Sequence, residues 1–280
     1  MVKVGVHVSI AGGIELSVPR AVDAGCDTYQ IFSRSPRGWR FSDLDISTVR
    51  EFRGNLSATR IGPVVDHMPY LPNLAAADSE NYGKSVATLT AELIRCDQLG
   101  IPYLVTHLGH HGGEGKEAGY RQVIGAVNRA LAAAPGSVML LLETTAGEKN
   151  SVGGAFEDLQ AILDGIDDRK RMGVCYDTCH TFAAGYDLRT PEKLGETLDH
   201  FNDAIGLSLL RVVHLNDSRG ELGGHWDRHE HIGMGFIGEQ GFRTFLDHPV
   251  FRDIPLICET PVDERRDDRG NIAKVRELAA

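Results

Sequence analysis

Short apolar runs recur at regular intervals along this chain and restrict its fold more than any other feature. Eight of them, rich in Val, Ile, Leu and Tyr, occur in 280 residues, about one every 35. They are Val2–Val8, Thr28–Phe32, Gly62–Asp66, Tyr103–Thr106, Val138–Leu142, Gly173–Tyr176, Arg211–Leu215 and Pro255–Cys258. Runs of this kind, without polar alternation, are typical of parallel strands that are covered on both faces.

Helix-like segments separate the runs. The clearest are Ser79–Leu99, Lys116–Ala134 and Val262–Leu278, and Asp78 and Ser79 are suited to cap the first of them. Eight strands that alternate with helices predict a closed (β/α)8 barrel, the TIM-barrel fold. A doubly wound open sheet is the alternative that the pattern alone leaves open.

Composition and charge narrow the class of protein. No linker interrupts the chain, which predicts a single domain over residues 1–280. No apolar run approaches the roughly 20 residues needed to cross a bilayer, and no signal peptide is evident, so we expect a cytoplasmic protein. The net charge of −10 opposes non-specific binding of nucleic acid. A nuclease of this charge would need metal ions or a local basic patch.

The polar residues that follow the strands carry the functional signal. In a β/α barrel the carboxyl ends of all strands open on one face, where the active sites of this fold lie. Strand two ends in Phe32, Ser33 and Arg34 and is the exception. The other strands end at or just before His7, His67, His107, Glu143, Asp177, His214 and Glu259.

A lone histidine or glutamate at a strand end is more often a hydrogen-bonded structural residue. So many carboxylates and imidazoles on one rim would repel one another, and divalent metals would resolve the repulsion. Ligands of these two types suit zinc, manganese or iron. The loops after strands six and seven add His180, Asp227 and His229, which could also form an ordinary solvated loop.

Nine candidate metal ligands result. They are His67, His107, Glu143, Asp177, His180, His214, Asp227, His229 and Glu259. A tetrahedral zinc takes only three or four protein ligands, so nine predict two or three ions that share a bridging carboxylate. Divalent ions about 3.5–4 Å apart are the recurring device for in-line attack on phosphate esters. The pattern therefore favours a metal-dependent phosphodiesterase.

Four sequence strings at these positions resemble the endonuclease IV family. They are HVSIAGG at His7–Gly13, GVCYDTCHTFAAGYDL at Gly173–Leu188, HLNDS at His214–Ser218 and DRHEHIGMGFIG at Asp227–Gly238. The resemblance implies a DNA-repair enzyme on a xylose isomerase-like TIM barrel that cleaves duplex DNA 5′ to abasic sites, leaving a 3′-hydroxyl and a 5′-deoxyribose phosphate. It also implies trimming of blocked 3′ ends, and a monomer that associates with the nucleoid when it acts on DNA.

The resemblance further implies three zinc ions per chain, with manganese as an alternative at one position, and attack by a metal-bound hydroxide. Glu143 and Glu259 would be the catalytic residues. The implied ligand groups are His67, His107 and Glu143 for the first ion, Glu143, Asp177, His214 and Glu259 for the second, and His180, Asp227 and His229 for the third.

Three residues match the positions at which the family fills the gap left by a flipped-out nucleotide. They are Arg37, Tyr70 and Leu71, although without the resemblance Tyr70 and Leu71 would more often be an ordinary loop anchor. Arg34 and Arg40 flank Arg37, so the three arginines are expected to form the local basic patch that the net charge requires.

The sequence departs from the family pattern at two positions. Leu108 stands where the family often has proline, and Glu148 adds a negative charge near the expected DNA site.

The sequence also leaves two other functions open. One alternative is a divalent-metal sugar isomerase or epimerase of the same superfamily, which needs fewer ligands. The other is a zinc protein that binds damaged DNA without cleaving it.

Overall fold

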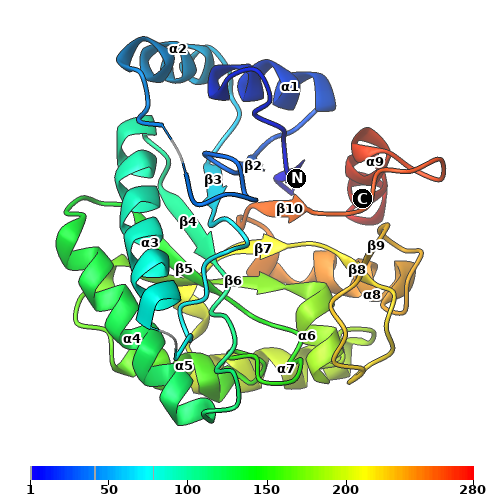
Figure 1. Ribbon diagram of the computed structural model, residues 1–280. Helices are drawn as coiled ribbons and strands as arrows, with labels where there is room; N and C mark the ends of the chain where they lie inside the picture. The colour runs from blue at the N-terminus through cyan, green and yellow to red at the C-terminus, as the bar shows by residue number, and fades with distance from the viewer. Residues whose placement is uncertain (1, 41, 78) are drawn as a thin grey trace.

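Eight parallel strands form the centre of the molecule, and helices surround them (Figure 1). The computed structural model describes residues 2–40, 42–77 and 79–280. The strands are hydrogen-bonded in the order β1-β10-β7-β6-β5-β4-β3-β2. Their bounds are Val4–Val6 (β1), Tyr29–Ile31 (β2), Val64–His67 (β3), Tyr103–Thr106 (β4), Met139–Glu143 (β5), Met172–Asp177 (β6), Leu210–His214 (β7) and Leu256–Cys258 (β10).

The first and second strands meet and complete the ring. His7 and Gln30 form a parallel bridge, and the backbone N–H of Val8 donates to the carbonyl of Gln30 at 2.7 Å. The TIM-barrel prediction is thereby confirmed and the open doubly wound sheet is excluded. Inside the ring, alternating strand residues form a compact apolar cluster, as barrel interiors do. Its members are Val65, Val105, Leu141, Cys175, Val212 and Ile257.

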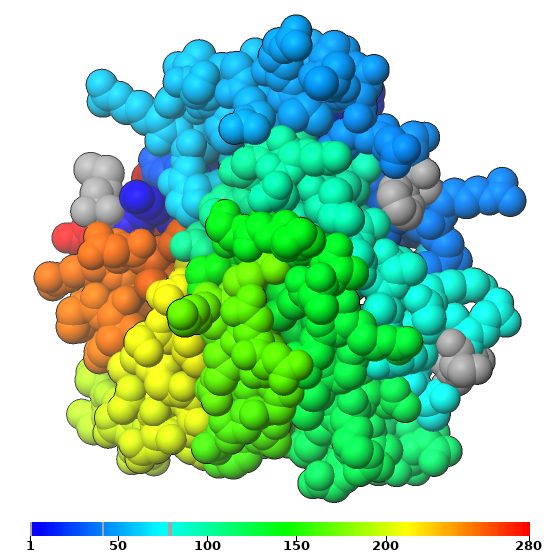
Figure 2. Space-filling model, turned by 90° about the vertical axis from the view of Figure 1, so that its left-hand side faces the viewer, coloured from blue at the N-terminus to red at the C-terminus, as the bar shows by residue number. Residues whose placement is uncertain are grey.

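Helices surround the barrel, and except for the largely buried Thr178–Ala184 they turn apolar faces inward. They are α1 (Ser17–Ala24), α2 (Ile46–Ser57), α3 (Ser79–Leu99), α4 (Lys116–Ala133), α5 (Phe156–Asp164), α6 (Thr178–Ala184), α7 (Pro191–Ala204), α8 (Gly238–Asp247) and α9 (Asp268–Leu278). From the side of α3 and α4, the surface passes in chain order from blue through green to yellow and orange (Figure 2). Among the described residues, no helix has both the length and the apolar composition that a membrane crossing requires.

Some predicted boundaries were wrong. The last helix begins at Asp268 and not at Val262, because the Asp267 side chain accepts from the Gly270 N–H at 2.8 Å and caps it there. The helix predicted to reach Ala134 ends one residue earlier. Asp78, expected as a cap, lies outside the described residues.

A small antiparallel ribbon lies after β7, at the end of the barrel where the strands finish (Figure 1). It pairs β8 (Asp217–Ser218) with β9 (His229–Glu230). The buried Asp217 carboxylate accepts hydrogen bonds from the N–H groups of Gly235, Ile237 and Gly238 at 2.9–3.2 Å. These contacts hold the loop that follows the ribbon, while His229 is placed by its pairing with Ser218 in the ribbon.

Candidate metal centre

The nine side chains predicted as ligands lie together at the carboxyl end of the barrel. They form three groups, within each of which the potential ligand atoms lie no more than 4.8 Å apart. The groups are His67, His107 and Glu143; Glu143, Asp177, His214 and Glu259; and His180, Asp227 and His229. These are the same groups that the family resemblance implies, and their donor types suit zinc.

The buried carboxylate of Glu143 belongs to two of the groups. Its Oε2 lies 3.2 Å from Nε2 of His67 and 2.9 Å from Nε2 of His107. Its Oε1 lies 2.9 Å from Nδ1 of His214. A carboxylate whose two oxygens face separate ligand groups has the geometry of a bridge between two ions.

Hydrogen bonds fix which nitrogen each histidine turns toward the centre. Nδ1 of His67 donates to the carbonyl of Met68 at 2.7 Å, and Nε2 of His214 donates to Oε1 of Gln30 at 2.8 Å. In each case the other ring nitrogen faces the carboxylates, where it could bind a metal ion once it is unprotonated. Metal-binding histidines are oriented in this way by partners outside the metal shell.

The third group shows the clearest fit to a cation. Nδ1 of His180 donates to the Thr144 carbonyl at 2.9 Å, and Nδ1 of His229 donates to the Glu259 carbonyl at 3.0 Å. The two Nε2 atoms are buried, make no hydrogen bond to any residue that the structure describes, and lie 3.2 and 3.4 Å from the same Asp227 oxygen. Buried polar atoms normally have partners, and a cation between these three atoms would supply one.

Electrostatics in the protein alone show how strongly the centre attracts positive charge. Burial lowers the pKa of His180, but nearby carboxylates, chiefly Asp177 and Asp227, outweigh burial and raise that pKa well above 6.5. Burial also opposes the charged form of His214, whose pKa is nevertheless raised well above its ordinary value by Cys175 and the surrounding carboxylates. The same negative surroundings that favour a proton on these rings would favour a metal ion in its place.

The carboxylates respond in the opposite direction. Burial disfavours the charged form of Glu143, yet His107 and His214 hold its pKa well below the ordinary value. Burial acts likewise on Asp227, and His180 still lowers the pKa of this carboxyl to about 2. Both groups are therefore ionised at neutral pH, which is the form that binds a metal.

Several supporting residues were missed in the sequence. The side-chain amide of Asn216 donates to Asp177 at 2.8 Å, and its oxygen accepts from the Glu259 N–H at 2.7 Å. Gln30 donates to Glu259 at 2.6 Å, so β2 contributes to the centre even though its end does not. Asn216 lies in the HLNDS string and could have been suspected, whereas nothing about Gln30 singled it out. Cys179 was not predicted as a ligand, but it forms a fourth group of potential ligand atoms with Asp177 and His229.

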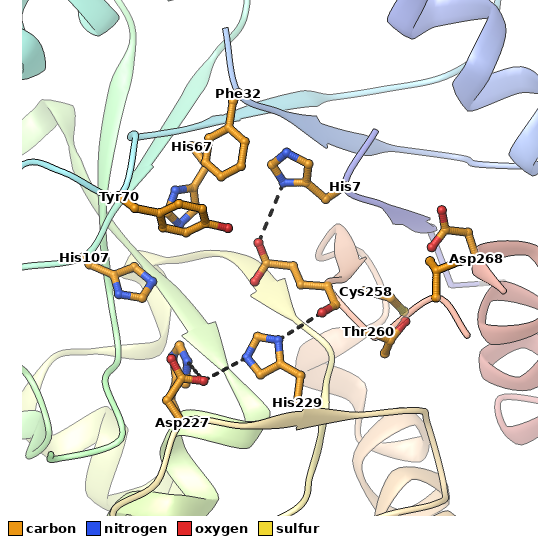
Figure 3. Close-up of a pocket in the computed structure, with 13 residues that line it drawn as sticks. His7, Phe32, His67, Tyr70, His107, Asp227, His229, Cys258, Thr260 and Asp268 are labelled. Carbon is orange, nitrogen blue, oxygen red and sulfur yellow. Dashed lines mark hydrogen bonds and ion pairs between the residues drawn. The ribbon is translucent and has the colours of Figure 1, made fainter. Parts of the chain in front are cut away.

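A cavity of about 310 Å³ opens above these groups. Figure 3 shows Tyr70 and Phe32 along one side of it, with Asp227 and His229 opposite. The side chains of His107 and Asp227 are 42% and 38% exposed, so a ligand can reach the centre from solvent.

The predicted DNA-contacting residues are on the same face. Tyr70 and Leu71, in the loop between β3 and α3, are 67% and 39% exposed, and the Tyr70 ring lies edge-on to Phe32 at 5.0 Å. Arg37, between β2 and α2, is exposed, as is Arg40. An exposed aromatic beside an exposed aliphatic side chain at the edge of a cavity is suited to stacking on a base or sugar.

The prediction that Arg34 belongs to an exposed basic patch was wrong. Arg34 is buried, and its Nε lies 2.6 Å from Oε1 of Glu92, so its charge is neutralised inside the protein. Leu108 packs in the core. Glu148 is half-buried and accepts a long hydrogen bond, 3.5 Å, from the N–H of Asp227, so its charge lies beside the third group.

Comparisons with known proteins agree with this geometry. The family described as xylose isomerase-like TIM barrel matches residues 18–279. "Probable endonuclease 4" of Methanoculleus marisnigri is 65% identical over 280 residues, covering 100% of this chain and 99% of the relative. The protein of the same name from Methanosphaerula palustris is 55% identical, again over 100% and 99% of the two chains.

Solved structures give the same result. Endonuclease IV from Thermus thermophilus has a TM-score of 0.87 and 38% identity, covering 99% of this chain and 98% of that one. A D-tagatose 3-epimerase-like protein has a TM-score of 0.74 over 99% and 95% of the two chains, but at 17% identity it shares the fold alone. The chain therefore belongs to the endonuclease IV family of the xylose isomerase-like TIM barrels.

Proposed function

We propose that this protein is a zinc-dependent DNA-repair endonuclease that hydrolyses the phosphodiester 5′ to abasic sites in duplex DNA, and that it also trims blocked 3′ ends. The observation that carries the proposal is the set of three ligand groups, two of them joined through Glu143, beneath a cavity edged by Tyr70. The family relationship supports the same activity.

Zinc held by these groups would supply an activated water near neutral pH and positive charge for the developing charge on the phosphate. The protein's own contribution is to place the ligands. The two oxygens of Glu143 hold the first and second groups next to each other. Gln30 and Asn216 restrain the Glu259 side chain and backbone respectively.

Glu259 is proposed as a catalytic residue as well as a ligand. It lines the cavity, and Nδ1 of His214 lies 3.2 Å from its Oε2. Burial opposes its charged form, yet His214 and His7 hold its pKa well below the ordinary value. Its carboxylate can therefore accept a hydrogen bond from the attacking water and orient it toward the phosphate.

Arg37, Tyr70 and Leu71 are proposed to read the lesion. An abasic site leaves a gap in the base stack, and an aromatic with an aliphatic side chain can fill it. Arg37 would place positive charge against the backbone, which offsets part of the repulsion from a chain of net charge −10.

The sugar isomerase alternative receives no support beyond the fold. Three solved structures share the architecture: a D-tagatose 3-epimerase-like protein, a 3-keto-D-glucoside 4-epimerase and a D-psicose 3-epimerase. Their sequences are only 17%, 13% and 14% identical to this chain. The third group, His180 with Asp227 and His229, is a further site that the expected one or two ions of an isomerase would not need.

Two measurements on purified protein test the proposal. Elemental analysis is expected to find zinc, about three ions per chain if each group holds one. A duplex with one tetrahydrofuran abasic analogue is expected to be cut on its 5′ side only, leaving a 3′-hydroxyl, whereas an intact duplex is not. Tight binding without scission would instead support the non-cleaving alternative. One manganese per chain with no zinc would favour the isomerase.

A further inference from the structure

A buried polar network behind the β2–α2 segment is used by none of the chemistry described above. The segment comprises residues 33–40 and 42–45 among those described, and it carries Arg37. The network consists of Ser33, Arg34, Asp66, Glu92 and Arg95. All five residues are buried, so none of them can touch DNA directly.

Arg95, on α3, forms hydrogen bonds with two separate positions of this segment. Its Nη2 donates to the carbonyl of Ser33 at 2.5 Å, and its Nη1 donates to the carbonyl of Ser42 at 3.0 Å. Its Nε also donates to Oγ of Ser33 at 2.9 Å. One planar guanidinium thus holds two backbone positions nine residues apart in the sequence.

Two carboxylates complete the arrangement around Ser33. The hydroxyl of Ser33 donates to Oε2 of Glu92 at 2.5 Å, and its N–H donates to Oδ1 of Asp66 at 2.8 Å. Glu92 also holds the guanidinium of Arg34 inward. Asp66 immediately precedes His67 on β3, so the strand that presents His67 to the metal centre also fixes the start of the segment.

Stability alone does not account for such a network. Buried ion pairs lose about as much free energy through desolvation as they gain from attraction, and apolar residues of equal volume often serve as well. What the network does provide is a defined geometry for a short, otherwise exposed segment. A segment already held in its binding conformation avoids the entropy cost of ordering when DNA binds.

We propose that Arg95 is a positioning residue for lesion recognition, which acts by holding the β2–α2 segment so that Arg37 meets the DNA. This inference rests on the proposed function. Lysine cannot replace Arg95, because a single ammonium group lacks the planar fork that reaches both carbonyls.

The test compares Arg95→Lys with wild type as full-length, zinc-loaded protein. On the abasic-analogue duplex, KM is expected to rise about tenfold while kcat changes little, because positioning affects binding before chemistry. Zinc content and hydrolysis of bis(p-nitrophenyl) phosphate, which is too small to reach the segment, are expected to match wild type. In an Arg37→Ala background, Arg95→Lys is expected to have little further effect on KM.

Arg171→Lys is the matched control. Arg171 likewise joins separate backbone positions, because it donates to the carbonyls of Leu131, Ala134 and Val138, but it precedes β6 and lies away from the segment. It is expected to change the melting temperature without changing KM for the duplex. Ser33→Ala is a milder second variant that removes only the hydroxyl, and it is expected to raise KM by a smaller factor.

The outcomes separate the two proposals. A wild-type protein that fails to cut the abasic duplex overturns the proposed function and this inference with it. If wild type cuts the duplex, an unchanged KM in both Arg95→Lys and Ser33→Ala overturns the inference alone. So does an equal rise in KM for Arg171→Lys, or equal losses for Arg95→Lys on the duplex and on the small phosphodiester.

Discussion

At the scale of single residues, the properties of this site follow from which atom of each side chain faces inward. The imidazoles of His67, His180 and His229 each donate one N–H to a backbone carbonyl and turn the other nitrogen to the centre. Glu143 divides its two oxygens between neighbouring groups. The role of each residue is therefore best tested by a substitution that removes one charge while keeping the side-chain shape, or by one that removes a single ring.

Glu259→Gln is expected to abolish cleavage while leaving affinity for the abasic duplex largely intact. The glutamine amide has the shape of the carboxylate, and its oxygen can still accept the hydrogen bond from Gln30. The negative charge, however, is lost from the cavity. Loss of one preorganised catalytic group typically costs about 10²–10³ in kcat. Single-turnover cleavage and fluorescence anisotropy measure the two quantities, and an unchanged cleavage rate would refute the role of Glu259.

Tyr70→Ala is expected to weaken binding to the abasic duplex by about 1–3 kcal/mol, because a stacking surface is removed. Tyr70→Phe is the matched control, since it keeps the ring and removes only the hydroxyl. Titrations of both variants with abasic and intact duplex separate lesion reading from general affinity. An equal loss on the two duplexes would contradict a lesion-specific wedge.

At the scale of elements, the residues that stabilise the barrel and the residues of the candidate metal centre lie in different places. The carboxyl ends of the strands present the ligands, while the helices bury apolar faces against the outside of the barrel. The ends of the helices are fixed by local caps such as Asp267 on α9. A cap can therefore be removed with little consequence for the metal centre.

Asp267→Ala is expected to destabilise the protein by about 1 kcal/mol, because the N–H of Gly270 loses its acceptor. Urea unfolding followed by circular dichroism measures the change. Zinc content and kcat on the abasic duplex are expected to remain at wild-type values. A loss of zinc in this variant would show that α9 and the metal centre are coupled more closely than their separate contacts indicate.

At the scale of the whole molecule, protons and metal ions are expected to compete for one buried cluster. In the metal-free protein the raised pKa values of His180 and His214 add stability below their ordinary value of 6.5, and this stability is lost as pH rises through the raised values. The lowered pKa of Glu143 adds stability above its ordinary value of 4.5. The histidine and the glutamate contributions to stability are therefore both present between pH 4.5 and pH 6.5.

Zinc is expected to reverse this dependence. Its ligands must be unprotonated histidines and carboxylates, so zinc binding strengthens as pH rises while the metal-free protein loses its histidine contribution. The difference in melting temperature between zinc-loaded and chelator-treated protein should therefore grow from about pH 5 to about pH 8. Differential scanning calorimetry of the two forms across that range is the measurement. A constant difference would contradict competition between protons and metal.

From the sequence, both the barrel and the residues at its carboxyl end could be predicted. Eight apolar runs separated by helices favoured a closed barrel over an open doubly wound sheet, and the contact between β1 and β2 excluded the open sheet. A closed barrel brings every strand end to the same rim whatever the side chains are. Six of the nine candidate ligands could be predicted in this way because they lie at a strand end or directly after one: His67, His107, Glu143, Asp177, His214 and Glu259. His180 lies in the first turn of α6, and Asp227 and His229 lie between β7 and α8, so their pairing with the others depended on the family resemblance.

The partners of those residues became known only from the folded chain. Arg34 and Arg37 look alike in the sequence, but Glu92, which lies on α3 far along the chain, draws one inward and leaves the other exposed. Gln30 reaches Glu259 across 229 positions of sequence. Such pairings depend on which elements the fold places side by side, and no local pattern of residues records them.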